Sequence, residues 1–149
     1  MGEMEQSTAD YLISLEKRIN DSYISLPLVN DKLTLNVQSI DGNETFLLDV
    51  NRAGSIRLSR CTFQERYSVT IILVRLDLDD GKSHQNPDGK VIRGPHIHIY
   101  KEGYGDRWAY LLSEIDSFSF SNTLDLLTSF TEFCSYCNIS NIPAIQRSL

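Results

Sequence analysis

The stretch Tyr67–Asp77, with the sequence YSVTIILVRLD, is the most strongly β-branched part of the chain. Val, Ile and Thr favour an extended backbone, because their branched side chains pack well on a pleated surface. We therefore predict that this stretch is the central strand of a sheet. Side chains alternate between the two faces of a strand. This places the odd-numbered residues, including Arg75 and Asp77, on one face and the even-numbered residues on the other.

Shorter stretches on both sides of Tyr67–Asp77 also show strand patterns. Residues 33–38 alternate between apolar and polar side chains, and Asp41–Asn43 is a turn sequence that leads into a returning strand at 45–50. Together with further strands expected at 55–60, 95–101 and 107–112, this predicts about six antiparallel strands between residues 33 and 112.

Apolar residues at three- and four-residue spacing predict a helix before this sheet and another after it. The first is expected at 7–21, with Ser7 as its N-cap, and the second at 122–137. Residues 138–149 are expected to form a peripheral tail. The predicted fold is a single α+β domain over residues 1–149, a curved antiparallel sheet flanked by an N-terminal and a C-terminal helix.

Length and composition are typical of one soluble globular domain. The chain has 149 residues, of which 41% are hydrophobic and 23% charged. No apolar run approaches the roughly 20 residues needed to span a bilayer, so no membrane association is expected. The three cysteines do not suggest a disulfide framework, which favours a cytoplasmic location.

The charge distribution points to the middle of the chain. The net charge of −6 argues against nucleic-acid binding by the whole surface. Residues 52–107, however, carry more Lys and Arg than Asp and Glu, and they contain all three histidines. Chemistry on an anionic substrate is therefore expected in this part of the chain.

Strand alternation brings the histidines together. His96, His98 and Tyr100 share one strand face, and pairing with the neighbouring strand would place Arg75 beside them. His84 lies in a long polar segment that is expected to fold back over this face. Imidazoles move protons near neutral pH and a guanidinium binds phosphate oxygens, so the group predicts a phosphate site.

One interpretation of this group is metal-independent cleavage of RNA. One histidine would take the proton from a ribose 2′-hydroxyl, and a second group would protonate the leaving 5′-oxygen. Arg66 or Arg75 would hold the pentavalent phosphate, and Tyr104 and Trp108 would stack on unpaired bases. This chemistry needs no metal and no cofactor.

Three other interpretations stay open. His96-x-His98 followed by Glu102 matches half of a cupin metal motif, but no histidine follows His98. A zinc site would require Cys134 and Cys137 as further ligands, although both lie on the apolar stripe of the second predicted helix. The third interpretation is that the histidines form only a polar, solvated strand face. We therefore predict no metal site.

The string PHIHIYKEGYGDRWA, which ends at Ala109, resembles a family of uncharacterised small bacterial and phage-borne proteins. Gln64–Tyr67 and Asn86–Gly89 are similar to the same family, and the resemblance extends from Leu33 to about Ile139. It implies no settled activity.

A looser similarity is to TumE-like toxins of toxin–antitoxin modules. These carry an Arg-x-Asp strand, a histidine soon after it and a later Pro-His-x-His cluster. Here Arg75-Leu-Asp77, His84 and Pro95-His96-Ile-His98 occur in that order. The similarity implies an endoribonuclease-like toxin, or a relative that keeps the scaffold without the activity.

Two functions follow as expectations. The first is a metal-independent endoribonuclease-like toxin of a toxin–antitoxin or phage-defence system, with RNA as substrate and a cognate antitoxin as partner. The second is a non-enzymatic acidic inhibitor from a mobile element, which would bind a host defence complex that handles nucleic acid. The acidic balance of the chain favours the second, because phosphate-binding toxins are usually basic. The sequence predicts no oligomeric state.

Overall fold

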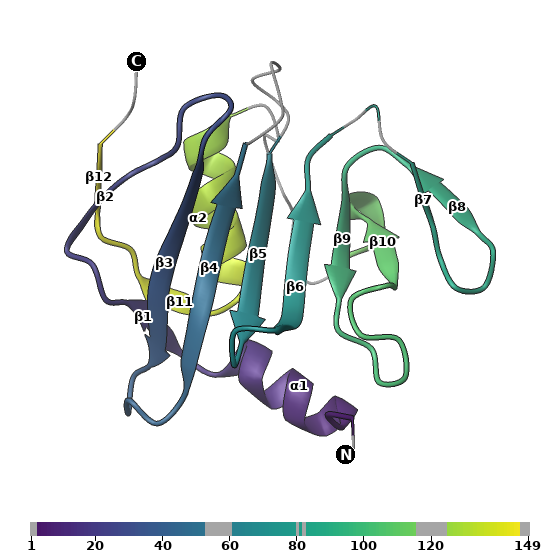
Figure 1. Cartoon of the computed structure of the whole chain (residues 1–149), viewed down its shortest axis with the longest axis horizontal. Helices are drawn as coiled ribbons and strands as arrows, with labels where there is room; N and C mark the ends of the chain where they lie inside the picture. Colours follow the sequence, from purple (N-terminus) through teal and green to yellow (C-terminus); the bar gives the residue numbers. More distant parts are fainter. Residues whose placement is uncertain (1–2, 53–60, 80, 82, 116–124, 147–149) are drawn as a thin grey trace.

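The protein was analysed as a computed structural model that describes residues 3–52, 61–79, 81, 83–115 and 125–146 (Figure 1). The predicted strand at 55–60 and the first residues of the second predicted helix, 122–124, lie outside these ranges. The elements are, in chain order, α1 (Gln6–Ser14), β1 (Lys17–Ile19), β2 (Tyr23–Ser25), β3 (Lys32–Ser39), β4 (Thr45–Asn51), β5 (Thr62–Tyr67), β6 (Ile71–Asp77), β7 (Ser83–Gln85), β8 (Val91–Arg93), β9 (His96–Ile99), β10 (Ala109–Leu111), a short 3-10 helix (Leu112–Glu114), α2 (Leu126–Tyr136), β11 (Ile139–Asn141) and β12 (Ala144–Gln146).

The expected α+β class is confirmed, but the main sheet formed by the described residues has eight strands rather than about six. Their order is β10-β9-β6-β5-β4-β3-β1-β11, and every neighbouring pair is antiparallel except β1 with β11. Two small sheets pair β12 with β2 and β7 with β8. The strands at 32–39 and 45–51 confirm the predicted hairpin, which turns at Gly42 with a φ of 78°.

The stretch Tyr67–Asp77 is not one central strand. It contains the end of β5, a tight turn and the whole of β6, and it lies off the centre of the sheet. Ser68 and Val69 make the turn with φ angles of 51° and 69°, a left-handed conformation that β-branched residues rarely adopt. The turn contains none of the usual Asn-Gly or Asp-Gly signals, and the residues around it have a high β-propensity. The sequence therefore predicted one continuous strand.

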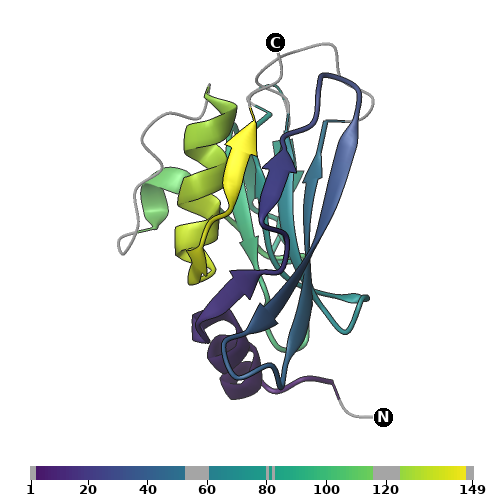
Figure 2. The ribbon, with the colours of Figure 1, turned by 90° about the vertical axis from the view of Figure 1, so that its left-hand side faces the viewer.

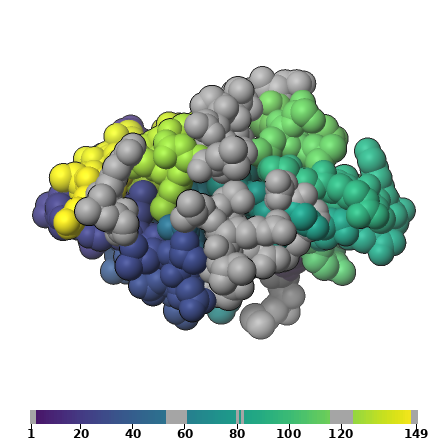
Figure 3. Space-filling view, turned by 90° about the horizontal axis from the view of Figure 1, so that it is seen from above, coloured from purple at the N-terminus to yellow at the C-terminus, as the bar shows by residue number. Residues whose placement is uncertain are grey.

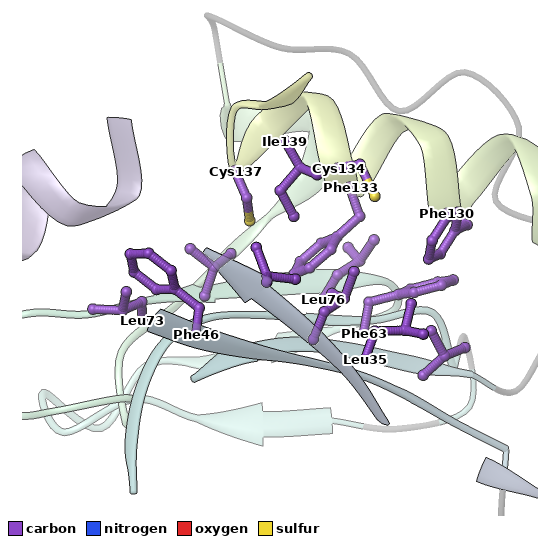
Figure 4. Packing of buried hydrophobic residues seen from close by; sticks show 14 of the residues in the cluster. Leu35, Phe46, Phe63, Leu73, Leu76, Phe130, Phe133, Cys134, Cys137 and Ile139 are labelled. Carbon is purple, nitrogen blue, oxygen red and sulfur yellow. The ribbon is translucent and has the colours of Figure 1, made fainter. Parts of the chain in front are cut away.

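A β-bulge resets the alternation along β6. Glu65 pairs with Val74 and Arg66 pairs with Ile72, so Leu73 is an extra residue in β6. Leu73 joins the core, contrary to simple alternation, and lies beside Phe46 (Figure 4). Beyond the bulge the side chains alternate as predicted. Arg75 and Asp77 lie on one face of the sheet, and the buried Val74 and Leu76 lie on the other.

The first helix ends at Ser14, not at residue 21. Leu15 is already extended, and Lys17 and Ile19 pair with Ser39 and Val37 of β3. Both Lys17 and Ile19 are buried, whereas Arg18 between them is exposed. Apolar residues in this segment fit both a helical and an alternating pattern. The segment forms a strand because it pairs with β3.

The C-terminal segment is not a peripheral tail. Helix α2 begins after Asp125, whose side chain accepts a hydrogen bond from Thr128 N. The helix ends before Asn138, which has a φ of 56°. The chain then adds β11 beside β1 and β12 beside β2, both in parallel. Ile139 is buried in the same core as α2.

The core lies between the sheet and α2 (Figures 2 and 4). The ring centroids of Phe130 and Phe133 lie 6.3 Å and 5.7 Å from that of Phe63 on β5. Helix α1 lies at one end of the strands, and its Ala9 and Leu12 belong to the same core as α2, so the arrangement is not clearly that of an N-terminal and a C-terminal helix that flank the sheet. Among the described residues, the other face carries no helix. None of the helices seen is both long and apolar enough to cross a bilayer.

A buried ion pair joins both helices to the sheet. The ammonium group of Lys17 donates to the carbonyl oxygens of Ile13 and Leu15 at the end of α1, at 2.9 Å and 2.8 Å, and to that of Cys137 at the end of α2, at 2.8 Å. Its Nζ also lies 3.7 Å from Oε2 of Glu65 on β5, and both side chains are almost fully buried. Burial raises the pKa of Glu65 to about 8, although Lys17 opposes this rise.

Candidate functional site

Pairing between β6 and β9 brings Arg75 and the two strand histidines together. Arg75 pairs with His98, and two residues further along β6, Asp77 pairs with His96. Ile97 and Leu76 are the pair between them and point into the core. The polar side chains therefore share the face opposite α2, and the predicted placement of Arg75 beside the histidines is confirmed.

The hairpin of β7 and β8 adds the third histidine. The ring of His84 on β7 lies 4.7 Å from that of His98 and 5.8 Å from that of His96, and the latter two are 5.0 Å apart. We call these three residues the histidine cluster. The segment with β7, β8 and β10 gathers at the end of the molecule opposite β12 (Figure 3). The expectation that His84 folds back over the strand histidines is confirmed.

Asn86 attaches this hairpin to the edge of the main sheet. Its side-chain amide donates to the carbonyl oxygen of Ala109 on β10 at 2.9 Å, and its Oδ1 accepts from Ala109 N at 2.8 Å. The two bonds imitate a strand pairing and satisfy backbone groups at an edge. They also hold His84, two residues before Asn86, next to His96 and His98.

Each ring of the cluster donates to a main-chain carbonyl oxygen, which fixes its tautomer. Carbonyl oxygens only accept, so the ring nitrogen in each contact carries the proton. The neutral rings therefore keep a lone pair on His84 Nδ1, His96 Nε2 and His98 Nε2. The contacts, each of 2.8 Å, are His84 Nε2 to Arg107, His96 Nδ1 to Gly94 and His98 Nδ1 to Asp106.

Arg75 lies between His98 and an acidic group. Its Nη2 donates to His98 Nε2 at 3.1 Å, and its Nη1 donates to Oδ2 of Asp106 at 3.1 Å. Burial, together with the charge of Arg75, lowers the pKa of His98 to about 3. His98 is therefore neutral near pH 7, and its remaining lone pair is engaged by Arg75.

The inner rings of the cluster are shielded from solvent. His96 is 2% exposed and His98 1% exposed, and both rings contact polar groups, namely main-chain carbonyl oxygens and, for His98, Arg75. An outward-facing, solvated strand face, as alternation alone predicts, is therefore wrong for these two rings, because the hairpin carrying His84 covers them. The side chains of Arg75 and Asp106 are each 30% exposed and form the accessible part of the site.

Two predicted substrate-binding residues lie outside the cluster. Arg66 shares the open face of the sheet but pairs with Asp49, with Nε 2.6 Å from Oδ2 and Nη2 2.9 Å from Oδ1. Tyr100 does not share the histidine face, because its ring belongs to the core and its hydroxyl donates to the carbonyl oxygen of Met4 at 2.7 Å. Residue 100 follows the last residue of β9, where strand alternation no longer applies.

Tyr104 and Trp108 form a small aromatic group in the loop between β9 and β10. Their ring centroids are 5.2 Å apart in an edge-on arrangement. Lys101 Nζ lies 4.2 Å from the Trp108 ring, and Arg107 lies over Tyr104 with its Cζ at 5.8 Å. The loop therefore presents two rings and two cations beside the carbonyl groups that hold the histidine cluster.

The metal interpretations receive no support from the geometry. Among residues in the described ranges, no three His, Cys, Asp or Glu side chains are placed to hold a metal ion. Glu102 instead accepts a bond from Gln6 N. Cys134 and Cys137 are buried under α2 on the other face of the sheet, where burial raises the pKa of both thiols.

Asp106 is a site residue that the sequence did not reveal. Its carboxylate holds Arg75 and its carbonyl oxygen holds His98. The available signal was its place after Gly103 and Gly105, which take φ angles of 88° and 61° and turn the loop back toward β6. Strand periodicity gives no information about such a loop residue.

Comparison with known proteins gives one result. A family model described as a family of unknown function, DUF6978, matches residues 4–139. No match was found among the curated proteins or among the solved structures.

Proposed function

Because the chain belongs to the DUF6978 family, whose function is unknown, we propose a function from the site itself: metal-independent cleavage of RNA, as expected of an endoribonuclease-like toxin. One observation carries the proposal. Three imidazoles with defined tautomers lie with their ring centroids within 5.8 Å of one another, and one of them, His98, contacts a guanidinium that is 30% exposed. Such a group combines proton transfer with the binding of a phosphate.

The contacts suggest a role for each residue. His84 is the most exposed ring, and Nδ1 would take the proton of a ribose 2′-hydroxyl, because among the described residues only its Nε2 has a hydrogen-bond partner. Nε2 of His96 lies 4.0 Å from Oδ2 of Asp77, and we assign His96 the role of the acid for the leaving 5′-oxygen. Arg75 would bind the phosphate, and neutral His98 would orient Arg75.

Residues outside the cluster would contribute to substrate binding. Tyr104 and Trp108 lie on the neighbouring loop and would stack on unpaired bases. Arg66, on the same face of the sheet, would contact a more distant phosphate. We assign no substrate contact to Tyr100, because its hydroxyl is engaged by Met4. A cytoplasmic location and a cognate antitoxin are parts of the same proposal.

The test is cleavage of single-stranded RNA by the purified protein in the presence of EDTA. We expect products with 2′,3′-cyclic phosphate ends, and a rate lowered by roughly 10²- to 10⁴-fold in His84→Ala and His96→Ala. Gln85→Ala, an exposed change in the same strand as His84, is the matched control and should cleave normally. An inactive wild type, folded by circular dichroism, would refute the proposal.

The burial of His96 and His98 favours a second candidate, a non-enzymatic inhibitor or interaction protein of a mobile element. In that case the cluster stabilises the sheet, and the acidic surface binds a host defence complex that handles nucleic acid. Expression in bacteria separates the two candidates. Growth arrest with RNA cleavage, both lost in the His96→Ala/His98→Ala variant, supports the enzyme. Harmless expression of both proteins, with binding to such a complex, supports the inhibitor.

A further inference from the structure

We propose that the carboxylate of Asp106 occupies the position of a phosphate on Arg75, so that an incoming phosphate binds this site by displacing it. The inference rests on the proposed function only for the identity of the ligand as a phosphate group of RNA. It adds that the Asp106 carboxylate competes with the phosphate for Arg75 and so weakens phosphate binding.

The two ends of the Arg75 guanidinium differ in their partners. Nη2 donates to His98, a ring that is 1% exposed and fixed by the loop. Nη1 donates to Asp106, whose side chain is 30% exposed. Phosphate and carboxylate oxygens both accept from a guanidinium with similar geometry. An anion that arrives from solvent would therefore replace the Asp106 carboxylate and leave the contact with His98 intact.

The carboxylate of Asp106 can leave Arg75 without opening the loop. The main-chain carbonyl groups of Asp106 and Arg107 hold His98 and His84, independently of the Asp106 side chain. The loop is also closed by two backbone bonds between Lys101 and Gly105, each of 2.9 Å. Displacement therefore requires only a side-chain rotation.

A second Arg–Asp pair on the same sheet face shows how a locked carboxylate differs. Asp49 accepts two bonds from Arg66, one from Thr34 at 2.7 Å and one from Gln64 at 2.9 Å, and these donors lower its pKa. Among the described residues, the Asp106 carboxylate has one hydrogen bond, of 3.1 Å. Asp106 is thus the weakly held member of the two pairs.

The experiment is a titration with inorganic phosphate, followed through the ring resonances of the three histidines by NMR near pH 7.5. Asp106→Asn keeps the shape and the main-chain carbonyl but removes the charge, and we expect phosphate to bind about two- to fivefold more tightly than to wild type. Asp49→Asn makes the same change of net charge at the locked pair and should leave the affinity at the cluster unchanged. Adding Arg75→Gln to Asp106→Asn should abolish binding.

Equal or weaker binding in Asp106→Asn would overturn the inference, as would equal tightening in Asp49→Asn. Asp106→Ala provides the same comparison if the Asn variant does not fold. The result is independent of catalysis. Tighter phosphate binding in a protein that cleaves no RNA would uphold this inference and refute the proposed activity. RNA cleavage by the wild type, with no tighter phosphate binding in Asp106→Asn, would uphold the proposed activity and refute this inference.

Discussion

Replacing Lys17 by Met tests whether one buried ammonium group connects both helices to the sheet. Met has a similar length and fits an apolar site, so the change removes the charge and the hydrogen bonds while keeping most of the volume. The three carbonyl oxygens that Lys17 contacts belong to the ends of α1 and α2. Carbonyl groups at the last turn of a helix have no partner within the helix.

The expected loss in the free energy of unfolding is about 4 kcal/mol. Removing one member of a buried ion pair typically costs about 3–5 kcal/mol, because the other charge stays buried without compensation. Glu65, 3.7 Å from the missing Nζ, would be that charge only at a pH above its raised pKa of about 8. Protonation of Glu65, whose pKa burial already raises, reduces the cost, while the three unpaired carbonyl groups add to it. A domain of this size is stable by about 5–15 kcal/mol, so the variant should lose a large fraction of its stability.

Urea unfolding, followed by the fluorescence of Trp108 and by circular dichroism, measures this loss. With a slope near 1.5 kcal/mol per M, the midpoint should fall by roughly 2–3 M. Arg18→Met, on the exposed side of the same strand, is the matched control and should change the stability by less than about 0.5 kcal/mol. The double variant Lys17→Met/Glu65→Leu should recover part of the loss, since no charge remains buried. A loss below about 1 kcal/mol in Lys17→Met would show that the contacts of Nζ do not connect the helices to the sheet.

Three further predictions concern pH and backbone strain. The pKa of Glu65 rises from 4.5 to about 8 on folding, so its contribution to stability should fall as pH increases through that range, and urea unfolding of Glu65→Gln should lack this decline. The pKa of His98 falls from 6.5 to about 3, so this group should reduce stability as pH drops through that range; an NMR titration in which His98 becomes protonated near pH 6 would contradict the assignment. Val69→Gly relieves a positive φ at an exposed turn and should raise the melting temperature by about 2–3 °C, whereas Thr70→Gly beside it should not; an unchanged value for Val69→Gly would show that the turn is unstrained.

The part of the fold that local pattern decides could be predicted from the sequence. Alternation between residues 33 and 38 and the Asp41-Gly42 turn gave the β3–β4 hairpin, because both depend on neighbours within a few residues. The short strand β1 lies in a segment whose apolar residues fit a helix as well as a strand, and β11 was expected to be part of a peripheral tail. Lys17–Ile19 became a strand only because β3 and β11 lie on its two sides, and those partners are distant along the chain.

The same distinction applies to the site. Alternation was sufficient to place Arg75 beside His98, since both lie beyond the bulge in regular strand. The return of His84 over the inner rings was expected from the long polar segment that contains it and not from alternation, and the contact of Asp106 with Arg75 was not expected at all. These contacts come from the hairpin of β7 and β8 and from the loop after β9, whose conformations depend on glycines and on side-chain bonds to backbone.

The parallel pairing of β1 with β11 has a consequence for the birth of the molecule on the ribosome. Residues 17–19 are made early, whereas their outer neighbour, residues 139–141, is made about 120 residues later. Closing so long a segment is slow, because the entropy of the intervening chain must be lost before the pairing stabilises it. The central hairpins can assemble during synthesis, whereas the edge formed by β1 must wait, exposed to chaperones and to other nascent chains, until β11 arrives.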